Sequence, residues 1–159
     1  NHRAPGAAVA VFDDGQVKAE IICDGLHVHP AVLRMAFSLL GENRTIIISD
    51  AMRAAGRPDG EYLLGDQTVR VMNGRTYCGD GRMAGSTTSI HKEIRNLLSY
   101  GIPFSRVIRS ATINPAVQLG MDSMTGSIEK DKYADLAVVD AGMNIRKVFV
   151  RGREVFSAI

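Results

Sequence analysis

Two aspartates each follow a short apolar run that predicts a β-strand. Asp50 comes after Ile46–Ile48 and Ser49, and Asp24 comes after Glu20–Cys23. A β-branched run without alternating polar residues is typical of a strand buried on both faces, as in a parallel sheet. In an α/β barrel the active site lies at the carboxyl ends of the strands, so a carboxylate there is well placed for catalysis. Taken locally, Asp50 has a second interpretation, as the cap of a following helix.

Two histidines close behind Asp24 are of a residue type that binds metals. His27 and His29 stand two positions apart, so on an extended strand both imidazoles would lie on one face and could reach one metal ion. The alternative is that one ring makes hydrogen bonds in a pocket while the other packs. The remaining histidines are His2 and His91, and four in all make a closed four-ligand site difficult to assemble.

Three further features could contact a ligand. The segment Gly79–Gly85 superficially resembles a dinucleotide-binding loop, but its final glycine spacing is wrong and a predicted hairpin precedes it. We interpret Ala84–Ser86 instead as the start of a helix whose free N–H groups could bind a ligand. Arg3, in a turn that contains Pro5 and Gly6, carries a guanidinium that would suit a phosphate. A lone arginine is, however, more commonly a surface residue.

The segments around these residues predict an alternation of strands and helices. Pro30–Leu40 has the apolar spacing of an amphipathic helix that ends at Gly41. Strand, helix and strand then form a βαβ unit, which brings both polar strand ends to the same edge of the sheet. Further along we predict a β-hairpin over 61–83, helices over 86–100 and 105–112, and a helical turn over 116–120. The tail predicts a strand over 134–140 and a short hairpin over 145–156 that turns at Arg151–Gly152, and residues 1–12 predict a loop.

Composition excludes several classes of protein. The chain has 159 residues, of which 45% are hydrophobic, enough for a sizeable core. A net charge of +2 with scattered charges, and 6% aromatic residues without Trp, predict no nucleic-acid partner. No apolar run approaches the roughly 20 residues of a membrane helix, so we expect no membrane partner. Cys23 and Cys78 are too few for a disulfide framework, which predicts a cytoplasmic protein.

Six motifs resemble, in the same order, those of the N-acetylglucosamine-6-phosphate deacetylases, a family of the amidohydrolase superfamily. The motif Asp24–Pro30 is specific to these deacetylases, whereas the last two motifs recur in many amidohydrolases. The resemblance covers essentially the whole chain, but only the carboxyl-terminal part of the family's length. The motifs are Arg3–Gly6, Asp24–Pro30, Ser49–Met52, Met83–Ser86, Ala111–Ala116 and Gly126–Leu136.

The resemblance implies an α/β fold in two parts. Residues 1–120 would form the carboxyl-terminal part of a (β/α)8 barrel, and residues 121–159 the carboxyl-terminal strands of a small β-sandwich domain. It also implies a metal-dependent hydrolase that removes the acetyl group from N-acetylglucosamine 6-phosphate, giving glucosamine 6-phosphate and acetate. The family resemblance further suggests a homodimer.

The resemblance assigns roles to particular residues. Asp50 falls on the catalytic carboxylate, which takes a proton from the metal-bound water and delivers it to the departing amine. Arg3 falls on a phosphate contact. The family's metal ligands, for zinc or iron, lie on earlier strands that this chain lacks, so we expect no metal and no turnover from this chain alone. The residues that fall on substrate-binding positions are Arg3, Asp24, Gly25, Leu26, His27, Met83, Ala84 and Gly85.

Two alternatives stay open. The motifs Ala111–Ala116 and Gly126–Leu136 fit equally well an amidohydrolase that acts on a cyclic amide or a dipeptide. A non-catalytic assembly module, in which a sheet edge and helices form a subunit interface, is the alternative from another class. Arg3 and the loop Asp24–His27 favour a phosphorylated amino sugar over the first of these.

Overall fold

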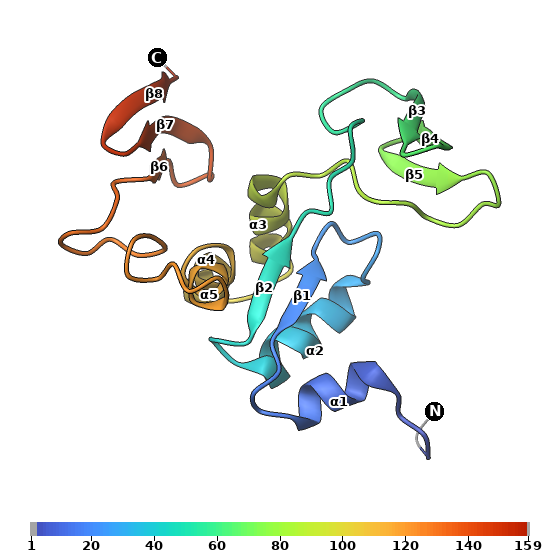
Figure 1. Cartoon of the computed structure of the whole chain (residues 1–159), viewed down its shortest axis with the longest axis horizontal. Helices are drawn as coiled ribbons and strands as arrows, with labels where there is room; N and C mark the ends of the chain where they lie inside the picture. The colour runs from blue at the N-terminus through green and yellow to red at the C-terminus, as the bar shows by residue number, and fades with distance from the viewer. Residues whose placement is uncertain (1–2, 159) are drawn as a thin grey trace. The chain divides into compact units, whose positions relative to one another are not determined.

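The computed structural model describes residues 3–158, which form two compact units that divide between Ala111 and Thr112. Helices and strands are both present, in agreement with the predicted α/β class (Figure 1). The prediction that residues 1–120 and 121–159 are separate domains stays a prediction. The longest helix of the described part has 11 residues, and none is long and apolar enough to cross a bilayer.

The first unit is built on a βαβ arrangement. Strand β1 pairs with β2 in parallel, from Ala19 opposite Thr45 to Ile22 opposite Ile48, and α2 connects the two. The carboxyl ends of both strands therefore lie at one edge of the sheet, as the sequence predicted (Figure 1). The elements of this unit are α1 (Ala7–Asp13), β1 (Ala19–Ile22), α2 (Pro30–Leu40), β2 (Thr45–Ile48), β3 (Gly60–Leu64), β4 (Gln67–Met72), β5 (Arg75–Cys78), α3 (Ile90–Ser99) and α4 (Phe104–Ala111).

The main core of this unit packs α2, α3 and α4 around β2. Phe37 of α2 and Leu97 of α3 are almost completely buried in it. Three consecutive residues of β2 are buried, which confirms the prediction that both faces of this strand are covered. The buried members of the cluster are Cys23, Leu33, Phe37, Ile47, Leu97, Ile102 and Val107.

A separate antiparallel sheet, β3–β4–β5, follows β2 in the chain. Its second turn, Asn73–Gly74, has two residues with positive φ angles (52° and 71°), the conformation that a two-residue hairpin loop requires. The predicted hairpin over 61–83 is thus a three-stranded sheet. It has its own small core, in which Met52, Ala54, Val69 and Val71 are buried.

The second unit contains one short helix and an antiparallel sheet. Helix α5 (Ile113–Gln118) precedes the strands β6 (Leu136–Val139), β7 (Ile145–Val150) and β8 (Arg153–Ser157). The turn Arg151–Gly152 joins β7 to β8, again with two positive φ angles (49° and 78°). This is the hairpin that the sequence predicted at these two residues.

Two local predictions were wrong. The first twelve residues include helix α1 rather than only loop, and the guanidinium of Arg44 donates to the carbonyls of Val11, Asp14 and Val17 at the end of that helix. This interaction spans about thirty residues and leaves no local signal. Helix α5 begins at Ile113, so Pro115 lies inside its first turn, where the missing N–H needs no partner.

Helix α2 offers a matched pair of substitutions that tests the core. Phe37 is 2% exposed and Leu39 is 56% exposed. We expect Phe37→Ala to lower the free energy of unfolding by about 3–5 kcal/mol, because it leaves a cavity, and Leu39→Ala to change it by less than about 0.5 kcal/mol. Urea denaturation followed by circular dichroism measures both. Similar losses in the two variants would contradict the assignment of the buried face.

Candidate functional site

Two segments that are distant in sequence are joined just beyond the end of β2. Ala51 and Ser86 form an isolated parallel bridge, in which the Ser86 amide donates to the Asp50 carbonyl (2.8 Å) and the Met52 amide donates to the Ser86 carbonyl (2.9 Å). The Ser86 hydroxyl also donates to the Ser49 carbonyl. The segment 83–86, which follows the β3–β5 sheet, is therefore fixed beside Asp50.

The loop that follows β1 is fixed to the same place through His27. One ring nitrogen, Nδ1, lies 2.8 Å from Asp24 Oδ2, and the other, Nε2, lies 2.9 Å from the carbonyl oxygen of Ala84. A carboxylate and a carbonyl can only accept hydrogen bonds, so both contacts are satisfied together only when both ring nitrogens carry protons. The geometry therefore favours the imidazolium form of His27.

The electrostatics agree with this protonation state. Partial burial opposes a charge on His27, but the hydrogen bonds to the Ala84 carbonyl and to Asp24, with the charges of Asp24 and Asp50, raise the pKa of His27 above its ordinary value. Burial likewise opposes a charge on Asp24, yet hydrogen bonds from the His27 and Leu26 amides (2.9 and 2.8 Å) and from the His27 ring lower the pKa of that carboxyl. The two residues form an ion pair.

Asp50 presents its carboxylate at the end of β2. Its side chain is exposed, and its φ angle is 45°, in the left-handed region that Asp adopts more readily than most residues. The backbone of Gly85 passes so close that a Cβ atom there would lie 2.8 Å from the Asp50 carbonyl oxygen and 3.3 Å from its Oδ2. Glycine is thus required at this position, since any side chain would displace Asp50.

Helix α3 supports the turn that carries Asp24 and His27. The side-chain amide of Asn96 donates to the carbonyls of Cys23 (3.4 Å) and Asp24 (3.2 Å). A Cβ atom on Gly25 would lie only 2.3 Å from the hydroxyl oxygen of Tyr100, and Gly25 has a φ angle of 80°. Sequence reasoning did not identify Asn96 or Tyr100, because only the packing of α3 against this turn gives them a role.

Glu93, on the same helix, is a second residue that sequence reasoning missed. Its side chain is 0% exposed, and neither carboxyl oxygen has a hydrogen-bond partner among the residues that the structure describes. Burial raises the pKa of Glu93 to about 7; the charge of Asp24 adds to the rise, and the Cys23 backbone and His27 oppose it. The one sequence signal for Glu93 is that a charged residue occupies a position of α3 whose spacing from Ile90 and Leu97 predicts burial.

Two sequence predictions about this region were wrong. His27 and His29 do not lie on a strand: the first is in the turn after β1, and the second is the N-cap of α2, where its Nδ1 accepts from the Ala31 amide (3.2 Å). The two rings therefore do not share a strand face. The segment Ala84–Ser86 is not the start of a helix, because α3 begins at Ile90 with Ser89 as its N-cap. Its amides at Ala84 and Ser86 are engaged by the carbonyls of Thr76 and Asp50.

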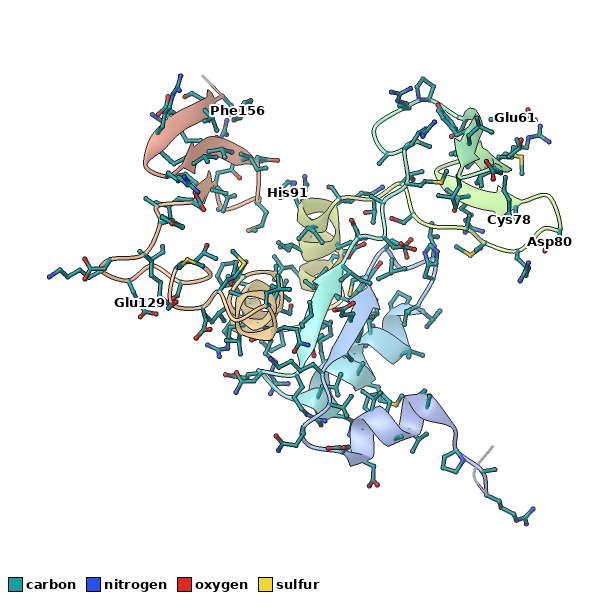
Figure 2. All side chains as sticks on the ribbon, viewed as in Figure 1. Glu61, Cys78, Asp80, His91, Glu129 and Phe156 are labelled. Carbon is teal, nitrogen blue, oxygen red and sulfur yellow. The ribbon has the colours of Figure 1, made fainter. Side chains whose placement is uncertain are left out.

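The structure thus brings together most of the predicted site residues, with Leu26 and Met83 each 40% exposed at the edge of the group. Arg3 is exposed in the turn before α1, a helix that lies away from the carboxyl ends of β1 and β2 (Figure 1). Within residues 3–158 no group of three His, Cys, Asp or Glu side chains could hold a metal ion, and His2 lies outside the described residues. Figure 2 shows the side chains of the described chain, with His91 labelled on α3.

Comparison with known proteins identifies a family. Residues 15–155 match the Amidohydrolase family. The chain is 35% identical to a putative N-acetylgalactosamine-6-phosphate deacetylase of Escherichia coli K12, with 96% of this chain and 92% of that protein covered. It is 37% identical to the N-acetylglucosamine-6-phosphate deacetylase of Vibrio furnissii, with 99% of this chain and 40% of that protein covered.

Solved structures give the same result. The N-acetylglucosamine-6-phosphate deacetylase of Thermotoga maritima superposes with a TM-score of 0.94 at 30% identity, over 99% of this chain and 44% of the other. A mutant of the Mycobacterium smegmatis deacetylase in complex with N-acetyl-D-glucosamine-6-phosphate superposes with a TM-score of 0.92 at 34% identity, over 99% and 42%. The chain therefore spans about two fifths of the length of most of these relatives.

The His27–Asp24 ion pair predicts a measurable titration. By nuclear magnetic resonance, we expect the His27 ring to titrate above the ordinary value of 6.5, and Asp24→Asn to lower its midpoint because the partner charge is lost. Since folding raises the pKa of His27 and lowers that of Asp24, the pair stabilises the fold fully between the ordinary values of 3.8 and 6.5, less as the pH rises through the folded pKa of His27, and less as it falls through that of Asp24.

Asp80→Asn is the matched control for this titration. It removes the same charge from an exposed carboxylate, one that is bonded to Arg82 instead. A His27 midpoint that shifts equally in the two variants would contradict a specific ion pair.

Proposed function

This chain belongs to the amidohydrolase family, and we propose that it supplies the catalytic carboxylate and the sugar-binding loops of an N-acetylglucosamine-6-phosphate deacetylase. One observation carries the proposal: Asp50, His27 and Gly85 converge at the carboxyl ends of two parallel strands. On this proposal residues 1–120 are the carboxyl-terminal part of a (β/α)8 barrel, in which that end of the strands holds the active site.

The proposed chemistry is hydrolysis of an acetamide. Asp50 takes a proton from the water that attacks the acetyl carbonyl, and then gives it to the nitrogen as the C–N bond breaks. The products are acetate and the free amine of glucosamine 6-phosphate. The exposed position of Asp50, fixed at its backbone by Ser86, suits a group that must reach both water and leaving nitrogen. A single residue can serve as base and then as acid because neither partner moves far between the steps.

The loops beside Asp50 are proposed to bind the sugar. The His27 imidazolium is a cation that lies within the influence of two carboxylates, Asp24 in its own loop and Asp50 after β2, and it offsets their charge for an anionic substrate. Leu26 and Met83 offer exposed apolar surface at the rim, beside the backbone of Gly25, Ala84 and Gly85. Arg3 is proposed as the contact for the phosphate, on the resemblance of its motif.

The cofactor is proposed to be held elsewhere. The amidohydrolase family is generally metal-dependent, and we propose zinc or iron for the complete enzyme. Residues 3–158 do not form a group that fits a metal ion, so its ligands would come from other residues of the active protein. We also propose that the complete enzyme is a homodimer and is located in the cytoplasm.

The identity of the sugar has two candidates. The relatives include both N-acetylglucosamine- and N-acetylgalactosamine-6-phosphate deacetylases, at 37% and 35% identity. An amidohydrolase that acts on a cyclic amide or dipeptide is the weaker alternative, because it accounts for neither Arg3 nor the Asp24–His27 loop.

A graft tests the proposal directly. This chain replaces the matching 40% of the Vibrio furnissii deacetylase, and acetate release is measured with both sugar phosphates and with unphosphorylated N-acetylglucosamine. We expect release from one or both sugar phosphates and little from the unphosphorylated sugar, and no release from this chain alone with zinc. A folded graft that is inactive on both phosphates would refute the proposal. Turnover by this chain alone would refute the proposed location of the metal ligands.

Asp50→Asn in the active graft isolates the proton-transfer role. The amide keeps the shape of the side chain but cannot accept the proton, so we expect kcat to fall by about 10²- to 10⁴-fold with an unchanged circular dichroism spectrum. Asp66→Asn, in the turn between β3 and β4, is the matched control and should keep nearly full activity. A near-normal rate for Asp50→Asn would exclude this role.

A further inference from the structure

We propose that Glu93 is a positioning residue for the Asp24–His27 pair: as a buried neutral carboxyl it lets the turn after β1 rest on α3, and its ionisation releases that turn. The inference rests on the proposed function only in giving the turn a substrate to bind. The positioning itself concerns this chain alone and is testable without turnover.

The geometry places Glu93 on the supporting face of α3. Asn96, three residues on, donates to the carbonyls of Cys23 and Asp24, and Tyr100, seven residues on, lies against Gly25. Residues at i, i+3 and i+7 share one face of a helix. Glu93, Asn96 and Tyr100 therefore form a polar stripe under the residues that begin the turn.

Glu93 differs from Asn96 in its hydrogen bonding. Asn96 has hydrogen bonds to the turn, whereas neither oxygen of the completely buried Glu93 has a partner with hydrogen-bond geometry in the described part of the chain. The Cys23 backbone opposes the rise in the pKa of Glu93 but does not cancel the effect of burial. A buried carboxylate without a partner is unfavourable, so this site accepts the protonated form and resists the charged one. The pKa of about 7 agrees with this environment.

The groups that face Glu93 determine what its ionisation does. The titratable groups that act on its pKa are Cys23 and Asp24, just after β1, and His27 in the turn. The Cys23 thiol is buried and its pKa is raised, first by burial and then by Glu93 and Asp24, so it stays neutral. A charge on Glu93 would therefore be repelled by the Asp24 carboxylate and only partly offset by the His27 imidazolium, and opening of the turn to water would relieve this repulsion.

The sign of the pH dependence follows from linkage. An opened turn lets Glu93 titrate at its ordinary value of 4.5, whereas in the closed turn it titrates near a pKa of about 7. The closed turn thus binds the proton more tightly, and opening becomes easier as the pH rises from 4.5 to 7, with little change above that.

Amide hydrogen exchange of the turn is the test. The amides of Leu26 and His27, which donate to Asp24, are followed by nuclear magnetic resonance at about pH 4.5 and 7.5 in the wild-type chain and in Glu93→Gln. The intrinsic pH dependence of exchange cancels in the ratio of the two proteins. We expect the wild type to lose about 10- to 300-fold more protection than the variant between the two pH values.

Three variants complete the test. Glu61→Gln removes an exposed carboxylate from β3 and should exchange like the wild type. Asn96→Ala should lower protection at both pH values by the same factor, because Glu93 still titrates. If Glu93→Gln does not fold, Glu93→Leu takes its place.

Equal pH dependence in the wild type and the Glu93 variant would overturn the proposal, as would an equal effect of Glu61→Gln. The result is independent of the graft experiment. An active graft together with a pH-insensitive turn would refute only the proposed role of Glu93. An inactive graft together with a pH-sensitive turn would refute only the proposed reaction.

Discussion

The imidazole of His27 is the interaction on which the candidate site depends. It donates to a carboxylate in its own loop and to a carbonyl 57 residues further along the chain. This hydrogen bond joins the turn after β1 to the segment that follows the β3–β5 sheet. Because both partners are acceptors, the bridge requires a charged ring; the hydrogen bonds to the Ala84 carbonyl and to Asp24, with the charges of Asp24 and Asp50, raise the pKa of His27 and keep it charged.

The elements that position the site were largely predictable from sequence. Apolar residues at a period of 3.6 predicted α2, and Gly41 predicted its end. A continuous apolar run predicted β2, because burial on both faces of a strand leaves a local pattern in the sequence. Parallel pairing followed from the βαβ order alone. The convergence of Asp24, His27 and Asp50 at one edge therefore follows from the apolar pattern and the order of the elements.

The contacts that complete the site were not predictable. Asn96 and Tyr100 support the turn after β1 from more than seventy residues along the chain. Outside the site, the contact between Arg44 and the end of helix α1 was equally absent from the sequence pattern. Such contacts depend on the packing of α3 and leave no periodic signal. The same limit explains why the pair His27 and His29 suggested a shared metal: spacing of two implies a common face only on a strand, and here the chain turns.

The bridge between Ala51 and Ser86 has a consequence for the evolution and engineering of this chain. It closes the excursion 52–85 at its base, and the excursion has its own small core around Val69 and Val71. Since the entropy of closing a flexible loop grows only slowly with its length, about 0.6 kcal/mol per doubling, the tip of this excursion can lengthen, shorten or carry an inserted domain at little cost. Such changes at the tip would leave the backbone of Asp50 fixed at the base, where the Ser86 amide donates to its carbonyl.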